Sequence, residues 1–307
     1  MRGMTQQELS PRAWTELAAL SLIWGASFLS IRVALDEIPV MTSVAHRVVW
    51  AAVALWLVVA LRRLPLPRDP RLWGAFLVMG LLNNVVPFTL MAWAQLHIET
   101  GLTSILNAAT AIWGVIVAAL VFADERLTLR KALGVALGFA GVAVAIGVDS
   151  LAALDLRSVA QLAVILGTLS YALAGTWARA RLSELSPIVA AAGMLTGSAV
   201  VMVPLAVAVD GPPAWPRSPV TFAAVAYYAL VSTALAYLLY YRVLRMAGSG
   251  NLLLCTLMIP PVAILLGAAV RGEALHAGAF AGFGLLAAGL LILDGRAVRY
   301  LRARRST

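Results

Sequence analysis

Two stretches of the sequence, 125-ERLTLRKALGVALGFAG-141 and 273-EALHAGAFAGFGLLAAG-289, follow one pattern. Each opens on Glu-x-Leu, and each carries two glycines, seven residues apart, at the same distance from the glutamate. The offset between the stretches is 148 residues (273 − 125), and the same offset relates Pro39 to Pro187. A pattern repeated at a fixed offset indicates that one structural unit occurs twice. We therefore expect two related halves.

The rest of the chain is apolar enough for a membrane protein. Hydrophobic residues make up 62% of the 307 residues and charged residues 12%, which leaves too little polar surface for a soluble domain of this length. Turn and charge signals divide the chain into ten apolar spans. Because a backbone amide cannot stay unpaired in lipid, we expect each span to be a helix. The expected spans are 14–35, 39–61, 72–95, 101–122, 130–148, 158–180, 187–209, 219–243, 249–270 and 277–295.

The basic residues predict the orientation. Of the 23 Lys and Arg, 18 lie at the two ends and in the even-numbered gaps between spans, four lie in the odd-numbered gaps, and Arg47 lies within the span 39–61. By the positive-inside rule, both termini are expected in the cytoplasm, which requires an even number of crossings. Five helices per half then insert the second half upside down relative to the first. Inverted repeats of this kind are typical of transporters that work by alternating access.

The expected fold is therefore an all-α integral membrane protein with ten transmembrane helices, arranged as two inverted five-helix repeats. Its parts are a first repeat over residues 14–148, a second repeat over 158–295 and a basic cytoplasmic tail over 296–307. The arginines of the tail follow an apolar span, where basic residues meet anionic lipid headgroups, so the net charge of +9 does not indicate nucleic-acid binding. The expected partners are the lipid bilayer and a small-molecule substrate. A monomer and a homodimer are both compatible with the sequence.

Several of these residues resemble a known family. Trp24-Gly25 in the first span, Pro39 with Arg47 in the second, and the Glu-x-Leu stretches that end both halves are similar to EamA-type transporters of the drug/metabolite transporter superfamily, in its ten-helix metabolite and amino-acid exporter branch. The resemblance covers residues 14–295. It implies a multi-pass exporter of small metabolites, amino acids foremost, in the bacterial inner membrane. It also implies a central cavity surrounded by helices 1–4 and 6–9, with helices 5 and 10 at the periphery.

The second half departs from the family's pattern at two positions. The residue that matches Trp24 is Tyr171 or its neighbour, and the residue that matches Arg47 is Leu195. The two halves therefore need not contribute equally to substrate binding.

Arg47 is the one basic residue expected deep in the membrane. It lies roughly 12 Å along its helix from Pro39, taking about 1.5 Å per residue, which is near the middle of the bilayer. Burial of this permanent charge costs at least about 2.5–3.5 kcal/mol, so some partner must offset it. One interpretation is that the guanidinium holds a substrate carboxylate by paired hydrogen bonds. We favour the other, a gating or structural role beside the cavity, because the family pattern carries this arginine across varied substrates.

Prolines inside the spans complete the predicted gating or structural set. Pro87 leaves the carbonyl of Asn83 without its helical partner, and Pro260 with Pro261 does the same in the ninth span. Such carbonyls are tolerated where they line a wet cavity or meet a donor from a neighbouring helix. A cavity wall or hinge and a simple packed kink both fit this pattern.

Polar and aromatic side chains near the middle of the spans are the expected cavity lining. They would suit a small neutral or zwitterionic solute. The alternative for each residue is helix–helix hydrogen bonding, worth only about 0.6–2 kcal/mol per pair. The predicted lining residues are Trp24, Asn83, Asn84, Asn107, Thr110, Tyr171, Thr233 and Tyr237.

Other classes of function lack the residues they need. No Asp or Glu lies in the central third of any span, which disfavours proton-coupled export of cations, although an exporter of drugs or other lipophilic compounds stays the alternative within transport. One cysteine and three scattered histidines supply neither a metal site nor a nucleophile–base set, so we expect no metal, no cofactor and no enzyme. An intramembrane enzyme is the alternative outside transport. The sequence contains no Gly-x4-Gly-Lys-Ser/Thr loop, so ATP is not expected to drive transport.

Overall fold

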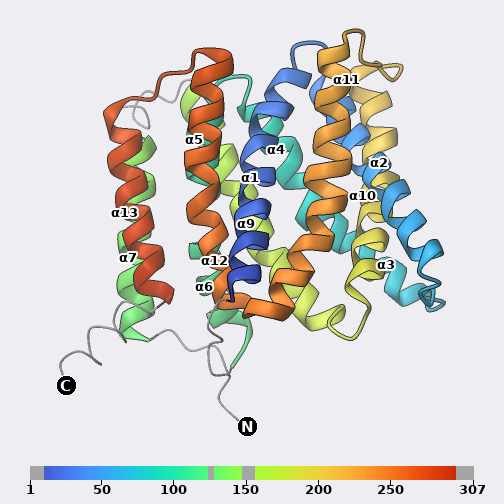
Figure 1. The fold of residues 1–307 in the computed structure, drawn as a ribbon, viewed down its shortest axis with the longest axis horizontal. Helices are drawn as coiled ribbons and strands as arrows, with labels where there is room; N and C mark the ends of the chain where they lie inside the picture. The colour runs from blue at the N-terminus through green and yellow to red at the C-terminus, as the bar shows by residue number, and fades with distance from the viewer. Residues whose placement is uncertain (1–9, 124–127, 147–155, 295–307) are drawn as a thin grey trace.

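The computed structural model describes residues 10–123, 128–146 and 156–294, and within these residues every regular element is a helix (Figure 1). The elements of the first half are α1 (Pro11–Ala34), α2 (Val40–Leu61), α3 (Pro70–Gly80), η1 (Leu81–Val85), α4 (Val86–Ala94), α5 (Thr100–Asn107), α6 (Thr110–Val121) and α7 (Leu129–Ile146). Those of the second half are α9 (Leu156–Arg181), α10 (Pro187–Asp210), α11 (Pro219–Ala226), η2 (Tyr227–Leu235), α12 (Ala236–Arg271) and α13 (Ala277–Asp294).

Local sequence sets where several of these helices begin. α1 and α3 each start on a proline, which follows Ser10 in one case and Asp69 in the other. The side chain of Ser10 accepts a hydrogen bond from the Ala13 amide at 3.2 Å, and that of Asp69 accepts one from the Arg71 amide at 2.9 Å. Such caps satisfy backbone donors that have no partner inside the helix, and proline at the first position sacrifices no hydrogen bond.

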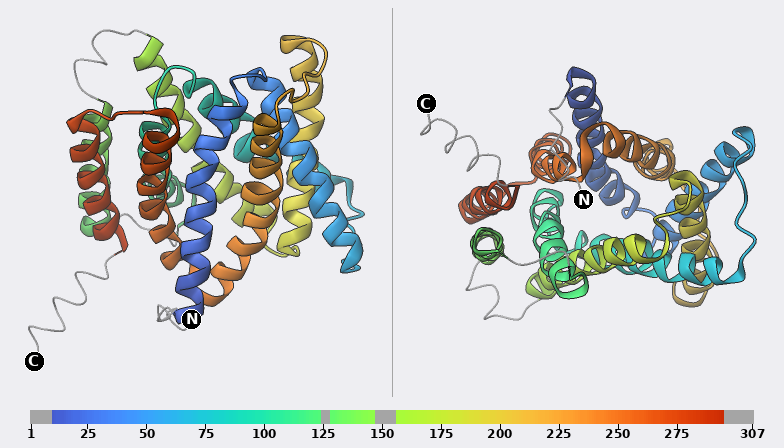
Figure 2. Two further views of the ribbon diagram at one scale, coloured as in Figure 1. Left: turned by 45° about the horizontal axis from the view of Figure 1, so that its top comes forward. Right: turned by 90° about the horizontal axis from the view of Figure 1, so that it is seen from below.

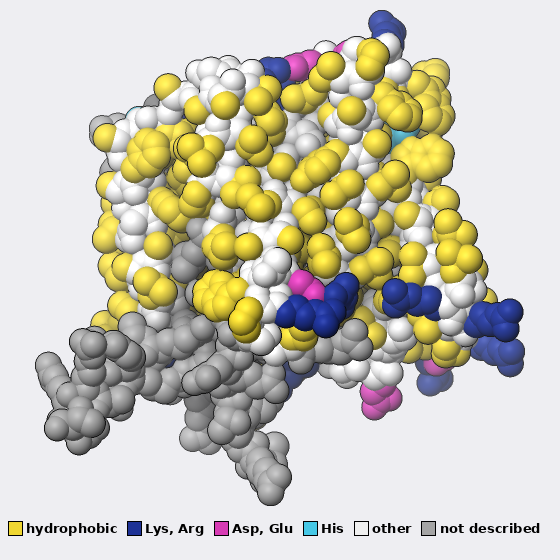
Figure 3. Space-filling view, in the orientation of Figure 1, with side chains coloured by type: hydrophobic (Ala, Val, Ile, Leu, Met, Phe, Trp, Pro, Cys, Tyr) yellow, Lys and Arg dark blue, Asp and Glu magenta, His cyan; other side chains and the backbone are white. Residues whose placement is uncertain are grey.

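Eight helical segments of the described residues are long and apolar enough to cross a membrane. The predicted ninth and tenth spans appear as shorter apolar helices, Met258–Arg271 within α12 and Ala277–Leu293 of α13. Large apolar side chains cover the side of the molecule seen in Figure 3, and charged side chains collect at its upper and lower rims. The chain is thus a multi-pass membrane protein. The eight segments are 11–34, 40–61, 70–94, 100–121, 129–146, 156–181, 187–210 and 219–243.

We call the end of the bundle at which α1 begins the proximal face, and the opposite end the distal face. In Figure 1 the proximal face is at the bottom. The turns that join α1 to α2, α4 to α5, α10 to α11 and α12 to α13 lie at the distal face (Figure 1). The turns that join α2 to α3 and α9 to α10 lie at the proximal face.

The helices form a ring, with α7 and α13 standing together at its edge (Figure 2). Within the ring, α2 packs on α10, α1 packs on α12, and both α4 and α6 pack on α9. Each of these pairs joins an element of the first half to one of the second. The two halves are therefore interleaved around the ring.

The repeated glycines hold α7 against α13. A Cβ atom added at Gly141 would lie 2.5 Å from the backbone nitrogen of Leu286 and 2.7 Å from the carbonyl oxygen of Gly282. Seven residues earlier, or about two helical turns, a Cβ atom added at Gly134 would lie 2.9 Å from the carbonyl oxygen of Gly289. Real Cβ atoms do not approach backbone so closely, so glycine is required for this packing, as is common between membrane helices. The glycines that repeat in the two halves of the sequence therefore form the interface between α7 and α13, which are equivalent helices of the two repeats.

Several predicted spans differ from single uninterrupted helices. The span 72–95 consists of α3, the π-helix η1 and α4, and a longer π-helix, η2, interrupts the span 219–243. The span 101–122 is broken between α5 and α6 at Ala108 and Ala109. α12 stays helical through the predicted gap after residue 243, and Figure 1 shows its ribbon changing direction at the proximal face.

Candidate functional site

Arg47 lies about two helical turns from the start of α2 and is half-buried. Its Nε donates a hydrogen bond to Oγ1 of Thr233 in η2 at 2.9 Å, and its guanidinium carbon lies 3.7 Å from the ring centroid of Phe88 in α4. In the described part of the chain no carboxylate forms an ion pair with it. The hydrogen bond and the cation–π contact offset part of the cost of burying the charge. The Nη atoms make no hydrogen bond to any described residue and stay accessible.

A small cavity adjoins this guanidinium. It has a volume of about 10 Å³ and is lined by Ser43, Arg47, Phe88 and Tyr228 among others. The Tyr228 hydroxyl donates to the Ser43 carbonyl at 3.2 Å and lies 3.1 Å from the Ser43 hydroxyl. A space of this size holds about one water molecule. In this conformation the cavity has no room for a metabolite.

The asparagines of η1 form a second polar group in the same region. The side-chain amide of Asn83 donates to the Tyr237 hydroxyl at 2.9 Å, and that hydroxyl lies 3.4 Å from the side-chain oxygen of Asn84. The amide of Asn84 donates to Oγ of Ser198 in α10 at 2.8 Å. Tyr237 packs against the same hydrophobic cluster as Phe88, the aromatic partner of Arg47. The first half supplies the asparagines and the second half supplies their partners.

The two π-helices occupy matched positions in the two halves. Adding the repeat offset of 148 residues to Leu81–Val85 gives 229–233, which lies within η2. In η1 the cause is Pro87, whose missing N–H leaves the Asn83 carbonyl without a helical partner, and the Val86 amide bonds five residues back to Leu81. A π-helix of one turn often marks a functional site because it changes the direction of the side chains it carries.

η2 contains no proline, and side-chain hydroxyl groups form the hydrogen bonds that accompany its wider turn. Oγ1 of Thr233 donates to the Tyr228 carbonyl, five residues back, at 2.7 Å, and Oγ of Ser232 donates to the same carbonyl at 3.0 Å. These bonds compete with the regular backbone ladder and stabilise the wider turn. Thr233 therefore shapes η2 and holds Arg47 at the same time.

The two aromatic residues predicted at matched places lie in different surroundings. Tyr171 in α9 is half-buried and meets the Phe88 ring edge-on, with centroids 6.5 Å apart, so it belongs to the Arg47 group. Trp24 in α1 donates its indole N–H to the Ser232 carbonyl at 3.1 Å and packs on the Tyr240 ring at 5.9 Å. Trp24 thus contacts the backbone of η2 from the α1 side.

Asn107 and Thr110 lie on either side of the break between α5 and α6. The Thr110 hydroxyl donates to the Asn107 carbonyl at 2.8 Å, and the side-chain oxygen of Asn107 is buried without a partner. Among the described residues no hydrogen bond connects either side chain to the Arg47 group. These two predicted residues therefore stand apart from the others.

Pro260 and Pro261 lie where α12 packs against α1. Pro260 is buried and Pro261 is exposed on the outside of the bundle. A Cβ atom added at Gly25 of α1 would lie 2.5 Å from Cβ of Val262 and 3.1 Å from the Ile259 carbonyl oxygen. The helix pair is closely packed at the level of the prolines.

Four residues of this region were not among the predicted ones. They are Ser43, Phe88, Ser198 and Tyr228. Ser43 precedes Arg47 by one helical turn, so the helical period could have indicated it. Tyr228 and Ser198 carry no such signal, because their partners lie on helices more than a hundred residues away in the sequence.

Carboxylates of one half cap helix starts of the other at the distal face. Oδ2 of Asp210 accepts hydrogen bonds from the Thr42 amide at 2.7 Å and the Thr42 hydroxyl at 2.9 Å, near the start of α2. Oε2 of Glu273 accepts from the Thr100 amide at 2.9 Å and the Thr100 hydroxyl at 2.6 Å, at the start of α5. Negative charge is favoured at these helix ends because it meets the positive end of the helix dipole.

Two further acidic residues join the halves at this face. Oε2 of Glu37 accepts from the amides of Arg217 and Ser218 at 2.9 and 3.1 Å, and hydrogen bonds from this segment lower the pKa of the Glu37 carboxyl to about 2. Asp36 pairs with Arg271 at 2.5 Å. Partial burial opposes ionisation of Asp36, but hydrogen bonds from Arg271 and Arg32 outweigh it and lower the pKa of the carboxyl. The distal face is therefore closed by polar contacts between the halves.

Comparison with known proteins identifies the family. Residues 14–147 and 158–293 each match the EamA-like transporter family. The chain belongs to that family. Both matched segments contribute residues to the polar cluster described above. The first segment supplies Arg47, Asn83 and Asn84, and the second supplies Thr233 and Tyr237.

Relatives of this EamA-like chain include named transporters. The "Uncharacterized inner membrane transporter YedA" of Escherichia coli (strain K12) is 26% identical over 260 residues, which cover 84% of this chain and 83% of the relative. The "Probable terminal-alkyne amino-acid exporter" of Streptantibioticus cattleyicolor is 27% identical over 296 residues, covering 94% of this chain and 95% of the relative. The "Uncharacterized transporter YoaV" of Bacillus subtilis (strain 168) is 20% identical over 254 residues, covering 82% and 86%.

A solved crystal structure shares the EamA-like chain's fold. Its TM-score is 0.65 at 17% sequence identity, and the alignment covers 92% of this chain and 96% of the other. At this identity the likeness concerns the fold alone.

Proposed function

We propose that this EamA-like protein is a secondary transporter that exports small metabolites, amino acids foremost, across the bacterial inner membrane by alternating access. The observation that carries the proposal is the state of Arg47. One of its nitrogens binds Thr233 of the other half, while its Nη atoms remain free of described partners beside a cavity between the halves. A permanent cation with free donors at membrane depth is a binding group for an anionic atom, so these free donors favour substrate binding over the purely gating or structural role expected from the family pattern.

The proposed topology has ten crossings with the proximal face in the cytoplasm. Among the residues that the structure describes, the distal face carries four arginines and five carboxylates, whereas the proximal loop between α2 and α3 carries three arginines and one aspartate. An excess of positive charge belongs on the cytoplasmic side. The shorter apolar segments of α12 and α13 would supply the ninth and tenth crossings. The distal face then opens to the periplasm.

A zwitterion fits the cluster better than a cation. The guanidinium of Arg47 would hold a carboxylate, and the amide and hydroxyl oxygens of Asn83, Asn84 and Tyr237 would accept from an ammonium group. No carboxylate lies among the described residues of this cluster, which disfavours a purely cationic drug. A relative named as a probable terminal-alkyne amino-acid exporter supports the same substrate class.

Alternating access accounts for the closed state of this conformation. The central cavity of about 10 Å³ cannot hold an amino acid, and contacts between the halves close the distal face. Movement of one half against the other would widen the cavity toward one side at a time. Arg47 and Thr233 would then act as a brace that forms when the halves come together.

Counterflow in proteoliposomes with a panel of labelled amino acids tests the proposal. We expect accumulation of at least one amino acid, and the same assay with and without a pH gradient decides between facilitated and proton-coupled export. Failure to accumulate any amino acid, by protein that elutes as a single folded species, contradicts the substrate class.

Two substitutions separate binding by Arg47 from bracing. Arg47→Gln should abolish counterflow whether Arg47 binds or braces. Thr233→Val removes only the partner of Nε and one hydroxyl bond in η2, so we expect a loss of about 1–2 kcal/mol in stability with transport retained. Arg62→Gln, at the exposed end of the same helix, is the control. If Thr233→Val stops transport as completely as Arg47→Gln, the bracing contact is the essential one and direct binding by Arg47 loses its support.

A further inference from the structure

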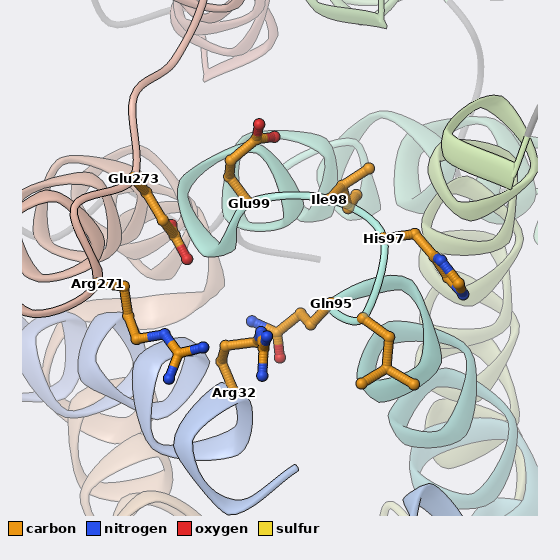
Figure 4. Close-up of a pocket in the computed structure, with 8 residues that line it drawn as sticks. Arg32, Gln95, His97, Ile98, Glu99, Arg271 and Glu273 are labelled. Carbon is orange, nitrogen blue, oxygen red and sulfur yellow. The ribbon is translucent and has the colours of Figure 1, made fainter. Parts of the chain in front are cut away.

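A second, larger cavity opens at the distal face, away from the central cluster. Its volume is about 230 Å³, and it lies between the end of α1, the turn from α4 to α5 and the turn from α12 to α13 (Figure 4). In Figure 4 the side chains of Arg32, Arg271, Gln95 and Glu273 are directed into one space. The first half supplies Arg32 and Gln95, and the second half supplies Arg271 and Glu273.

One side of this cavity carries an excess of positive charge. Arg32 and Arg271 share a single carboxylate, Asp36, with Nη1–oxygen distances of 2.7 and 2.5 Å. Two cations on one anion leave a net charge of +1. Each guanidinium has five N–H groups, and Asp36 occupies only some of them. The side chains are 23% and 28% exposed, so their free donors are accessible from the cavity but partly shielded from bulk water.

The other side offers acceptors. Thr100 occupies Oε2 of Glu273, and no described residue donates to Oε1. Gln95 is 2% exposed, its amide nitrogen donates to the Phe28 carbonyl at 3.0 Å, and its Oε1 has no partner. A buried acceptor without a donor costs free energy, so a small shift of the Gln95 side chain that brings Oε1 to a ligand N–H in the cavity would be favoured.

The remaining polar residues of the wall are already engaged elsewhere. Glu99 forms a two-point pair with Arg157 at 3.1 and 2.8 Å, and Figure 4 shows its carboxylate directed away from the shared space. The His97 ring packs on Trp93 with centroids 4.8 Å apart. The cavity thus has hydrogen-bond donors on the side of Arg32 and Arg271 and acceptors on the side of Glu273 and Gln95.

We propose that this distal cavity is a binding site for the zwitterionic head of an α-amino acid, separate from the central cluster. The carboxylate binds Arg32 and Arg271 beside Asp36, and the ammonium group binds Glu273 and Oε1 of Gln95. The proposal rests on the proposed export of amino acids, because the cavity lies at the face toward which they would be released. Because the site takes residues from both halves, it is complete only while the distal contacts between the halves are formed.

Protection of an engineered cysteine tests occupancy without requiring transport. Leu96 lines the cavity and is 43% exposed, whereas the single native cysteine, Cys255, is 1% exposed. We therefore use the full chain carrying Cys255→Ala and Leu96→Cys, solubilised in detergent, and measure its rate of labelling by an uncharged maleimide. The probes are L-alanine, propionate and ethylamine. Propionate lacks the ammonium group of alanine, and ethylamine lacks its carboxylate.

We expect L-alanine to slow labelling, with each single-charge analogue requiring about a tenfold higher concentration for the same protection, since one lost charged hydrogen bond corresponds to about that factor. In the Arg271→Gln variant, L-alanine should protect the cysteine from labelling no more strongly than ethylamine does. Arg217→Gln, at the same face but outside the cavity, is the matched control and should behave like the parent. If Arg271→Gln lowers the thermal stability of the protein, Arg32→Gln supplies the same test and Arg271→Lys should restore part of the protection.

Equal protection by all three probes, no protection by alanine, or unchanged protection in both arginine variants overturns the site. The proposed function fails separately. A protein that transports no amino acid in counterflow but is protected by alanine keeps the distal site and loses the exporter assignment. A protein that transports amino acids without any protection keeps the assignment and loses the site.

Discussion

At the scale of single residues, the partners of Arg47 illustrate how a charge inside an apolar span is held. Its Nε bonds to Thr233 and its guanidinium lies on Phe88, and both partners are on other helices. The sequence marks Arg47 as unusual and Thr233 as polar, but it does not show that the two are in contact. It also offers Asn107 and Thr110 as cavity residues, and in the structure they lie at a helix break apart from the cluster. Polarity in an apolar span can be read from a sequence, whereas the direction of a side chain depends on packing.

Glu37 provides a test at this scale through its pH dependence. Its hydrogen bonds lower the pKa of its carboxyl from an ordinary 4.5 to about 2, so the folded state favours the ionised form. This contribution to stability is complete above pH 4.5 and is lost as the pH falls through about 2. We expect Glu37→Gln to lower the thermal midpoint at neutral pH, with the difference from the parent shrinking as the pH falls below 4.5. A constant difference across this range would contradict the assigned role of the carboxylate.

At the scale of elements, eight of the ten predicted spans are confirmed among the described residues as helices long enough to cross a membrane, whereas the breaks inside the spans are not predicted. The positions of the helices follow from apolar length and turn signals, which are local properties. The π-helix η1 has a visible cause in Pro87, but the sequence alone fits a kink equally well. The π-helix η2 has no proline and depends on hydroxyl groups whose choice of backbone partner cannot be foreseen.

Pro87→Ala tests whether η1 matters to function. Alanine restores the missing N–H, so the segment can revert to a regular helix, which turns Asn83 and Asn84 away from Tyr237. We expect unchanged or higher thermal stability, because proline is costly inside a helix, and counterflow reduced by about tenfold or more as one or two hydrogen bonds are lost. Pro204→Ala, at an exposed position in α10, is the control and should leave transport unchanged. Normal transport by Pro87→Ala would show that the wide turn is dispensable.

The glycine interface between α7 and α13 offers a matched pair of substitutions on one helix. A Cβ atom at Gly282 would lie 2.4 Å from the backbone nitrogen of Ala145, whereas one at Gly284 meets nothing within 4 Å. We expect Gly282→Ala to lower the free energy of unfolding by about 1–3 kcal/mol, as overpacking does, and Gly284→Ala to leave it nearly unchanged. Thermal unfolding in detergent measures both. Equal effects of the two substitutions would mean that close packing is not what holds this pair.

At the scale of the whole molecule, the sequence predicts two halves but not how they close. The internal repeat and the apolar composition are properties of the entire chain and lead to a membrane protein of the EamA-like family. The contacts that seal the distal face join residues such as Thr42 and Asp210, or Asp36 and Arg271, which are 168 and 235 positions apart. Each carboxylate at a span end looks like an ordinary solvated group until the opposite half is in place.

The proposed orientation can be checked in intact cells. In a Cys255→Ala background, a cysteine at Trp215 of the distal turn or at Leu66 of the proximal turn would be well exposed, since both native side chains are 61% exposed. We expect a membrane-impermeant maleimide to label Trp215→Cys in intact cells whose outer membrane has been made permeable, and to label Leu66→Cys only after lysis. The reverse pattern would invert the topology and make the distal cavity an entry site.

The two π-helices also show how the two repeats are related. η1 and η2 have the same place in the two halves, but Pro87 accounts for one and a pair of hydroxyl groups accounts for the other. The same backbone shape at this position is therefore reached with two different sets of residues. Related chains should be aligned here by backbone conformation before they are compared by sequence.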